Sequence, residues 1–303
     1  MNFCKRILVL LLALSLVIVP LASCSESGDP TEATTEGSTE PNDPVVQANK
    51  RVLLVSIDGL RSDALLASPY AERLLQASTA YTAATTVYPS VTLPCHMSMH
   101  HGVSPTVHGV LDNSYTPAEM LTDGIAETLA KVGKTCAYFY NWGPLGDVID
   151  EGALVKHEYV AGETLGWAES NEALARACKD YLAANDTDFT FLYLGHLDEM
   201  GHQYGWLSAE YNEALHSSLT LMLDLVDTLS EDYTVILTTD HGGHGNGHGS
   251  ELAEDMTIPI LLMGADFAKG TSKEGGSILD VAPTVADLLG VLPVAEWEGT
   301  SLK

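Results

Sequence analysis

Residues 233–249 read Tyr-Thr-Val-Ile-Leu-Thr-Thr-Asp-His-Gly-Gly-His-Gly-Asn-Gly-His-Gly, an apolar run followed by a carboxylate, three imidazoles and five glycines. The apolar part, Tyr233–Thr239, predicts a buried β-strand. Asp240 and His241 then follow at the end of that strand, and two more histidines come soon after on backbone that glycine allows to wrap tightly. Carboxylate and imidazole are typical zinc ligands, so this run predicts a metal site and directs the search for further ligands upstream.

Two other apolar runs lead into acidic residues. Arg51–Ile57 ends at Asp58, and Phe189–Leu194 leads to Asp198, which stands four residues before His202. Residues at i and i+4 face the same way on a helical turn, so Asp198 and His202 form a candidate pair of ligands. A single acid after a strand is usually a turn residue. Three such acids at one edge of a parallel sheet instead predict a shared site.

Strand-like runs alternate with helical patterns along the chain. The expected strands are residues 51–57, 134–140, 189–194, 233–239 and 258–263, and the expected helices are residues 64–77, 117–132, 169–184, 208–229 and 280–289. Repeated β-α-β alternation produces a mostly parallel central sheet with helices on both faces. We therefore predict an α/β fold in a single domain.

The first 49 residues differ in composition from the remainder. Met1–Ser23 has a basic start, an apolar stretch and small residues before Cys24, which is the pattern of a lipoprotein-type signal peptide. Cys24–Asn49 is rich in Ser, Thr, Pro and acids, and it predicts a disordered linker. Residues 50–303 are enough for one large domain. We expect an exported protein, anchored through a lipid on Cys24 to the outer face of a bacterial membrane.

The charge balance is strongly acidic. Asp and Glu number 41 against 14 Lys and Arg, a formal net charge of −27. A polyanion would be repelled, which argues against nucleic acid as a bulk partner. A small phosphorylated substrate stays compatible if metal ions dominate the local field. Cys95, Cys136 and Cys178 form no C-x-x-C pair, so we expect buried free thiols.

The candidate ligands are the carboxylates of Asp58, Asp198 and Asp240 and the imidazoles of His202, His241 and His248. Oxygen and nitrogen donors without thiolate suit Zn²⁺, with Mn²⁺ and Fe²⁺ as alternatives. Six ligands exceed one tetrahedral zinc and fit two ions, which about 4 Å apart can clamp a phosphoryl displacement. The best candidate for a nucleophilic hydroxyl is Thr92, directly before a helix start that contains Pro94. The alternative is that Thr92 is simply the N-cap of that helix.

Five motifs occur in a fixed order from about Lys50 onwards. They are Asp58 after the first strand, Thr92-Leu-Pro-Cys-His96, His108-Gly-Val-Leu-Asp-Asn113, Asp198-Glu-Met-Gly-His-Gln-Tyr-Gly205, and Asp240-His-Gly with a later Gly-His248-Gly. In these motifs the chain resembles the nucleotide pyrophosphatase/phosphodiesterase (type I phosphodiesterase) family of the alkaline phosphatase superfamily. The motifs are specific because they occur in order and each falls where the predicted strands require it.

The resemblance implies an alkaline-phosphatase-like fold and a role for each matched residue. One metal ion would be held by Asp58, Thr92, Asp240 and His241, and a second by Asp198, His202 and His248. Thr92 would attack phosphorus to form a phosphothreonyl intermediate, and Asn113 would donate a hydrogen bond to a non-bridging oxygen. His248 is preferred to His244 as a ligand because it lies in Gly-His-Gly, and His244 would support the ligands from behind.

The chain departs from the family pattern next to Thr92. Leu93 stands where many nucleotide-cleaving members carry an aromatic side chain that stacks on a base, and Cys95 stands where asparagine is common. Recognition of a nucleobase is therefore left open. Trp142 and Tyr204 are candidate substrate contacts, with packing in the core or at the rim as the alternative role.

These observations predict a metal-dependent hydrolase of phosphodiester or pyrophosphate bonds that uses two divalent metal ions, most simply Zn²⁺. A phosphomonoesterase or a phosphonate hydrolase on the same scaffold is the alternative enzyme. No arginine stands out as a clamp for a terminal phosphate, which favours diesters. A non-catalytic binding lipoprotein at the cell surface is the alternative outside enzymes, and the oligomeric state is left open.

Overall fold

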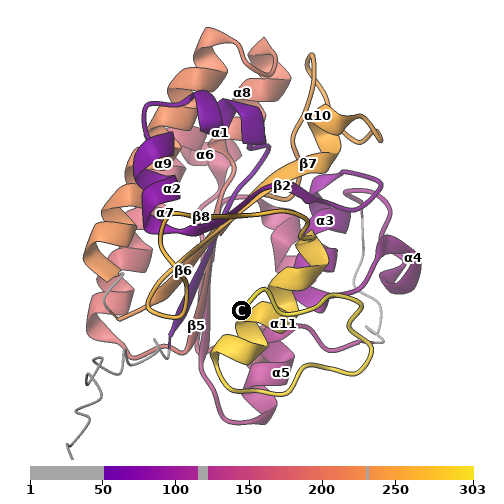
Figure 1. The fold of residues 1–303 in the computed structure, drawn as a ribbon, viewed down its shortest axis with the longest axis vertical. Coiled ribbons are helices and arrows are strands. Elements are labelled where there is room, and N and C mark those ends of the chain that lie inside the picture. Colours follow the sequence, from indigo (N-terminus) through magenta and orange to yellow (C-terminus); the bar gives the residue numbers. More distant parts are fainter. Residues whose placement is uncertain (1–50, 115–121, 230–231) are drawn as a thin grey trace, which may run out of the picture. The chain divides into compact units, whose positions relative to one another are not determined.

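The computed structural model describes residues 51–114, 122–229 and 232–303, which belong to one compact unit, Val45–Lys303. Its centre is an eight-stranded sheet with the order β4-β3-β5-β1-β6-β7-β2-β8 (Figure 1). The strands are β1 Val52–Ile57, β2 Thr79–Thr85, β3 Cys136–Tyr140, β4 Lys156–Tyr159, β5 Phe189–Leu194, β6 Thr234–Thr238, β7 Thr257–Met263 and β8 Thr271–Lys273.

Strand β1 lies at the centre of the site-bearing part of the sheet. It pairs in parallel with β5, with Ile57 opposite Leu194, and with β6, with Ser56 opposite Thr238. The carboxyl ends of these three strands therefore meet at one edge of the sheet. Strand β7 is antiparallel to both of its neighbours, β6 and β2, whereas the other pairings are parallel.

Helices cover both faces of the sheet. The helices are α1 Ser62–Ala67, α2 Ala71–Ala77, α3 Thr92–His101, α4 Pro105–His108, α5 Ile125–Lys131, α6 Gly162–Leu165, α7 Trp167–Ala184, α8 His196–Tyr204, α9 Ala209–Leu229, α10 Ala253–Met256 and α11 Val281–Leu288. Helices α3, α5 and α11 bury apolar residues in the core on one face, and α1, α7 and α9 do so in the core on the other (Figure 1). Successive residues of β1, such as Leu54 and Val55, point into opposite cores.

The predicted α/β fold with a mostly parallel sheet and two helical layers is confirmed. All five predicted strands are present, and β5 has the predicted bounds. The predicted helix 117–132 is wrong in its start: residues 115–121 lie outside the described part of the chain, and α5 begins at Ile125 after Gly124. Glycine at 124 has the extended backbone of an N-cap, with its N–H bonded to Glu127, so the helix starts there.

Three strands escaped prediction. Strand β2 mixes threonine with apolar residues, and β4 and β8 are short polar strands at the two edges of the sheet. None of the three therefore forms an apolar run. Helix α8 was expected only as one turn, and it follows β5 almost directly, so that Asp198 lies inside the helix rather than at the strand end.

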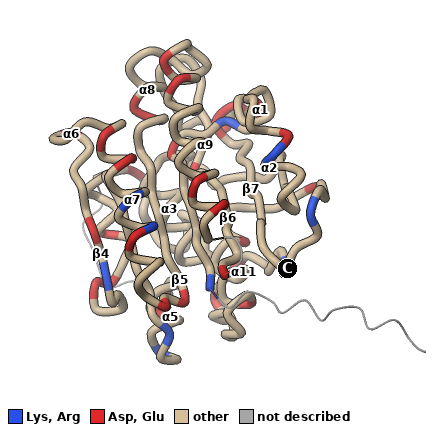
Figure 2. Tube along the Cα trace, turned by 90° about the vertical axis from the view of Figure 1, so that its left-hand side faces the viewer, with Lys and Arg blue, Asp and Glu red and all other residues tan. Residues whose placement is uncertain are grey.

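Acidic residues are spread along α9, which contains no lysine or arginine (Figure 2), and Glu213 and Asp227 on this helix are exposed. The predicted buried free thiols are present: Cys95, Cys136 and Cys178 are all buried and unbonded. Among the described residues, no helix has the length and apolar character needed to cross a membrane. The signal peptide, the lipid site at Cys24 and the linker fall on residues that the structure does not describe, so they stay predictions.

Candidate metal centre

The structure brings the seven predicted metal-ligating residues to one edge of the sheet in two adjacent groups. Asp58 follows β1, Asp240 and His241 follow β6, and Thr92 opens α3 beside them. The second group is Asp198 and His202 on α8 together with His248 from the glycine-rich loop. In each group of carboxylates and imidazoles the candidate donor atoms lie within 4.8 Å of one another.

The inner group, defined as Asp58, Asp240 and His241, is buried. His241 Nε2 lies 3.5 Å from Asp58 Oδ1 and 3.2 Å from Asp240 Oδ2. Thr92 Oγ1 lies 3.3 Å from the same nitrogen. A hydroxyl, an imidazole and two carboxylates therefore face one small volume between the ends of β1 and β6.

The outer group, defined as Asp198, His202 and His248, is more open. His202 Nε2 lies 3.3 Å from Asp198 Oδ2 and 3.1 Å from His248 Nε2. The rings of His241 and His248 stack at 3.7 Å between centroids, which places the two groups side by side.

Gly59 permits this close approach. Its φ of +68° is in the left-handed region, and a Cβ atom there would lie only 3.0 Å from Asp198 Cα and Oδ1. A side chain at 59 would therefore be strained and would push α8 away from the end of β1.

The three imidazoles all present the same nitrogen to the site. The Nδ1 atoms of His202, His241 and His248 face the backbone carbonyls of Asn246, Gly242 and Ser90 at 3.1, 2.8 and 2.8 Å. A carbonyl only accepts, so each Nδ1 carries a proton, and in the neutral ring each Nε2 is left with its lone pair towards the centre. A backbone partner that fixes the tautomer in this way is typical of metal-binding histidines.

Three buried carboxylate oxygens lack a hydrogen-bond partner among the described residues: Asp58 Oδ1, Asp198 Oδ1 and Asp240 Oδ2. Buried polar atoms are nearly always satisfied, so three orphans in one place require an explanation. Each lies within 3.9 Å of an imidazole Nε2, and Asp240 Oδ2 also lies 3.5 Å from His96 Nδ1. Buried carboxylates clustered with neutral imidazoles are an arrangement that divalent cations would satisfy.

The electrostatics of the two groups follow from burial and from like charges. Burial, together with the nearby carboxylates of Asp240 and Asp198, raises the pKa of Asp58 well above its usual value. The hydrogen bond to Asp198 raises the pKa of His202 to about 9. Burial lowers the pKa of His248 to about 4. Perturbed pKa values of opposite sign in one cluster are typical of functional sites.

Thr92 is the first residue of α3, and Val91 occupies the N-cap position without a side-chain cap bond. The interpretation of Thr92 as a simple N-cap is therefore wrong. Its hydroxyl is directed at His241 Nε2 instead.

Asn113 caps the same helix from a distance in sequence. Its Oδ1 accepts the backbone N–H of Leu93 at 2.9 Å. This bond fixes the orientation of the amide. Among the described residues, no acceptor takes the two N–H donors of the Asn113 amide.

Two further residues support the centre: Tyr193, which was not identified from the sequence, and His96, the last residue of the Thr92-Leu-Pro-Cys-His96 motif. The Tyr193 hydroxyl donates to Asp58 Oδ2, which leaves Asp58 Oδ1 directed at the centre. His96 bonds to the carbonyl of Thr92 at 2.9 Å and to Ser56 Oγ at 3.0 Å, so it ties α3 to β1. Tyr193 lies at an inward position of β5, and only the pairing of β5 with β1 reveals its partner.

His244 lies outside both groups. Its Nδ1 contacts Asp255 Oδ1 at 2.7 Å, and Asp255 Oδ2 also accepts from the backbone and hydroxyl of Ser250. Asp255 thus holds both ends of the loop that carries His248. This contact agrees with the expectation that His244 supports the ligands and is not itself a ligand.

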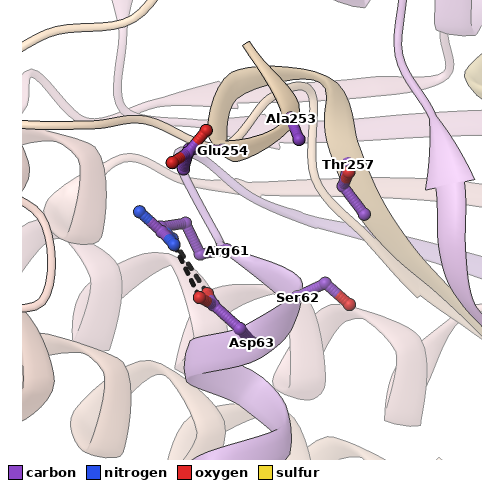
Figure 3. Close-up of a pocket in the computed structure, with 6 residues that line it drawn as sticks. All are labelled: Arg61, Ser62, Asp63, Ala253, Glu254 and Thr257. Atoms are coloured by element: carbon purple, nitrogen blue, oxygen red, sulfur yellow. Dashed lines mark hydrogen bonds and ion pairs between the residues drawn. The ribbon is translucent and has the colours of Figure 1, made fainter.

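A cavity of about 290 Å³ lies beside the centre, between the start of α1 and α10 (Figure 3). Its lining includes Arg61, Asp63 and Glu254. The Arg61 guanidinium donates to both carboxylate oxygens of Asp63 and to the Gly243 carbonyl. This arginine is therefore engaged by the protein itself.

The sheet order and the ligands at its carboxyl edge define an alkaline-phosphatase-like α/β fold. Residues 52–254 match the family model of type I phosphodiesterase / nucleotide pyrophosphatase. The chain therefore belongs to this family, as its motifs predicted.

Curated relatives match over part of their length. The chain is 26% identical over 204 residues to the 2,3-bisphosphoglycerate-independent phosphoglycerate mutase of Clostridioides difficile, covering 61% of this chain and 40% of the relative. It is 25% identical over 251 residues to ectonucleotide pyrophosphatase/phosphodiesterase family member 1 of Mus musculus, covering 72% of this chain and 27% of the relative. The chain thus spans less than half the length of either.

Solved structures share the fold. Murine ectonucleotide pyrophosphatase / phosphodiesterase 5, as an inactive variant in complex with AMP, has a TM-score of 0.68 at 17% identity and covers 80% of this chain and 96% of that chain. The phosphonate monoester hydrolase of Agrobacterium radiobacter has a TM-score of 0.67 at 15% identity, with 84% and 76% covered.

The segment that leads to Asn113 yields a prediction about pH. His108 Nδ1 accepts the backbone N–H of Val110 at 3.1 Å, and burial lowers the pKa of His108 to about 4. The unfolded chain gains a proton near pH 6.5, but the folded protein gains it only near pH 4. Stability from this group is therefore complete above pH 6.5 and is lost as the pH falls towards 4.

We expect His108→Asn, whose Oδ1 can still accept from Val110, to reduce this acid sensitivity by about 2 kcal/mol after allowance for partial exposure. Urea unfolding at pH 7.5 and 4.5 measures the effect. An equal loss of stability in both proteins would contradict it.

Proposed function

We propose that this protein hydrolyses phosphodiester or pyrophosphate bonds, with Thr92 as the nucleophile and two divalent metal ions as cofactors. The observation that carries the proposal is the convergence of three orphaned carboxylate oxygens and three imidazole Nε2 atoms around the Thr92 hydroxyl. Membership of the phosphodiesterase family supports it.

The donor set decides which residues would hold the ions. Asp58, Asp240, His241 and Thr92 would hold one, and Asp198, His202 and His248 the other. Nitrogen and oxygen donors in groups of three or four fit Zn²⁺. When bound, such ions lower the pKa of a bound hydroxyl or water and stabilise charge on the phosphoryl oxygens.

The residues of the chain then perform the remaining steps. Thr92 Oγ1 forms a bond to phosphorus as the bond from phosphorus to the leaving alcohol breaks, which leaves a phosphoryl ester on Thr92. Water hydrolyses this ester in a second displacement. The N–H donors of the Asn113 side chain stabilise a non-bridging oxygen in both steps. His96 holds the Thr92 carbonyl, so the nucleophile stays oriented.

The structural neighbours and the charges at the centre support a small phosphorylated substrate. One structural neighbour is a nucleotide pyrophosphatase/phosphodiesterase in complex with AMP, and another is a phosphonate monoester hydrolase, so small phosphorus esters are the common ligand class. Among the described residues, no free arginine lies at the centre to hold a terminal dianion, since Arg61 is engaged by Asp63. This arrangement favours diesters over monoesters.

Hydrolysis of bis(p-nitrophenyl) phosphate against p-nitrophenyl phosphate tests the proposal in the presence of zinc. We expect kcat/KM for the diester to be at least about tenfold higher than kcat/KM for the monoester. A tenfold ratio corresponds to about 1.4 kcal/mol of additional transition-state stabilisation. A faster monoester would make the protein a phosphomonoesterase. No turnover of either ester, with no bound metal, would favour a binding protein.

A further inference from the structure

Within the metal centre, exposure to solvent is greatest in the outer group. Asp58, Asp240 and His241 are buried, whereas the His202 side chain is 42% exposed. A substrate whose phosphorus meets Thr92 must therefore extend its remaining ester group outwards past His202, towards α8 and the loop that carries His248.

Four exposed apolar side chains lie on the segments that lead to and from the outer group. Tyr88, Tyr204, Leu207 and Leu252 are 45 to 56% exposed, and we call them the apolar rim. Their segments are joined to the outer group and to one another. Ser90, two residues after Tyr88, accepts from His248 Nδ1 through its carbonyl and donates to the carbonyl of Ser250, two residues before Leu252.

The other side of the rim is fixed by Trp206. Its backbone N–H donates to Gly245 at 2.8 Å, and its indole meets the rings of His202 and His248 edge-on at 5.2 and 5.9 Å. Tyr204 and Leu207 stand on either side of this anchor. The rim is therefore attached to the metal-ligating residues and not to a separate part of the surface.

Leu207 shows that one rim residue is held under strain. Its φ of +67° makes it the one non-glycine residue in the left-handed region among the described residues. A left-handed conformation costs a residue with a Cβ about 1 kcal/mol or more, and such strain concentrates at functional positions. An exposed leucine in a position that suits glycine needs a reason other than stability.

The segments that carry the outer group offer no lysine or arginine to an anionic group. Neither Leu74–Ala130 nor Asp180–Ala268 contains a lysine or an arginine, and these segments carry every site residue except Asp58. Arg61, close to Asp58 in sequence, is occupied by Asp63 and Gly243. A second phosphate or a carboxylate beyond the reacting phosphorus would therefore meet no free lysine or arginine from these segments.

We propose that the apolar rim binds an uncharged, apolar ester group, so that the substrate is a phosphodiester with such a group rather than a nucleoside polyphosphate. This inference rests on the proposed function and narrows its substrate class. The apolar side chains gain by covering the ester group, since removal of apolar surface from water is favourable.

Three diesters with one leaving group test the inference: methyl, phenyl and 4-carboxyphenyl p-nitrophenyl phosphate. With rates corrected for intrinsic reactivity, we expect kcat/KM for the phenyl ester to exceed that for the methyl ester about tenfold, mainly through KM. The 4-carboxyphenyl ester has nearly the same shape with one more anion, and we expect it to lose this advantage.

Rim variants locate the effect. In Tyr88→Ser/Leu252→Ser we expect the phenyl-to-methyl ratio to fall to near one. Leu207→Gly should lower the ratio without lowering the melting temperature, because glycine relieves the left-handed strain. Leu292→Ser is the matched control, since Leu292 is 87% exposed and lines a different cavity with Lys131 and Lys134.

The outcomes separate the two proposals. Hydrolysis of all three esters with equal kcat/KM, or a preference for the 4-carboxyphenyl ester, would overturn the apolar rim and leave the phosphodiesterase proposal intact. A ratio that falls equally in Leu292→Ser would also overturn it. Failure to hydrolyse any of the esters with metal bound would reject the phosphodiesterase proposal and, with it, this inference.

Discussion

Thr92→Ala is expected to lower hydrolysis of methyl p-nitrophenyl phosphate by about 10³-fold or more while the protein still binds its metal ions. The substitution removes the atom that forms the bond to phosphorus, and loss of a covalent nucleophile costs a factor of this size even when the rest of a site persists. The inner group keeps Asp58, Asp240 and His241, so its metal affinity should fall only modestly.

Three measurements make this prediction specific. Metal content of the purified variant separates loss of the nucleophile from loss of the ions. Mass spectrometry of acid-quenched wild-type protein should find the methylphosphoryl ester on the peptide that contains Thr92. Thr86→Ala is the matched control, because Thr86 is also buried and its hydroxyl donates to Cys95 Sγ away from the ligands. A Thr92→Ala variant with more than about a tenth of wild-type activity would reject the nucleophile.

The sequence predicted which side chains meet at one edge of the sheet because several of them follow a recognisable element, while their roles as metal ligands stay a prediction. Asp58 and Asp240 come directly after apolar strands, and parallel strands present their carboxyl ends at one edge. Asp198 and His202 are spaced for one helical face, and α8 has that conformation. The structure brings these side chains together with His241 and His248 as the pattern implied.

What escaped prediction depends on contacts between distant segments. The bond from Tyr193 to Asp58 joins residues 135 apart, and the cap of α3 by Asn113 crosses 20 residues. Neither has a local signal, because hydrogen-bonding side chains in strands and loops look the same with any partner. The apolar rim also lacks a local signal in the sequence. Nothing in the residues around Leu207 marks it, and only its left-handed backbone conformation distinguishes it.

Asp58→Asn is expected to have opposite effects on the metal-free and the metal-loaded protein. Without metal, Asp58 Oδ1 is buried without a partner among the described residues and lies near other carboxylates, which together with burial raise the pKa of Asp58. Because the folded-state pKa exceeds the unfolded value near 3.9, the metal-free fold is destabilised at pH 7. Removal of this charge should therefore stabilise the metal-free protein by about 1–2 kcal/mol, or roughly 2–8 °C in Tm.

In excess zinc we expect the opposite result, with the wild-type protein more stable than the Asp58→Asn variant. A ligand at 1,000 times its Kd stabilises the folded state by about 4 kcal/mol, and the wild-type protein should gain this stabilisation at the inner group. The amide that Asp58→Asn introduces binds a cation far more weakly than a carboxylate does. The variant should therefore lose that gain, together with about 10³-fold or more in activity.

Asp255→Asn distinguishes this effect from the general consequence of altering a buried aspartate. Asp255 is as buried as Asp58, but its oxygens accept from His244 and Ser250. Its replacement should destabilise the protein with and without zinc, since a satisfied acceptor is lost. Thermal melts of the three proteins after chelation and after addition of zinc provide the comparison. If Asp58→Asn lowers the Tm of the metal-free protein as Asp255→Asn does, the orphaned oxygens belong to a structural cluster and not to a site built for cations.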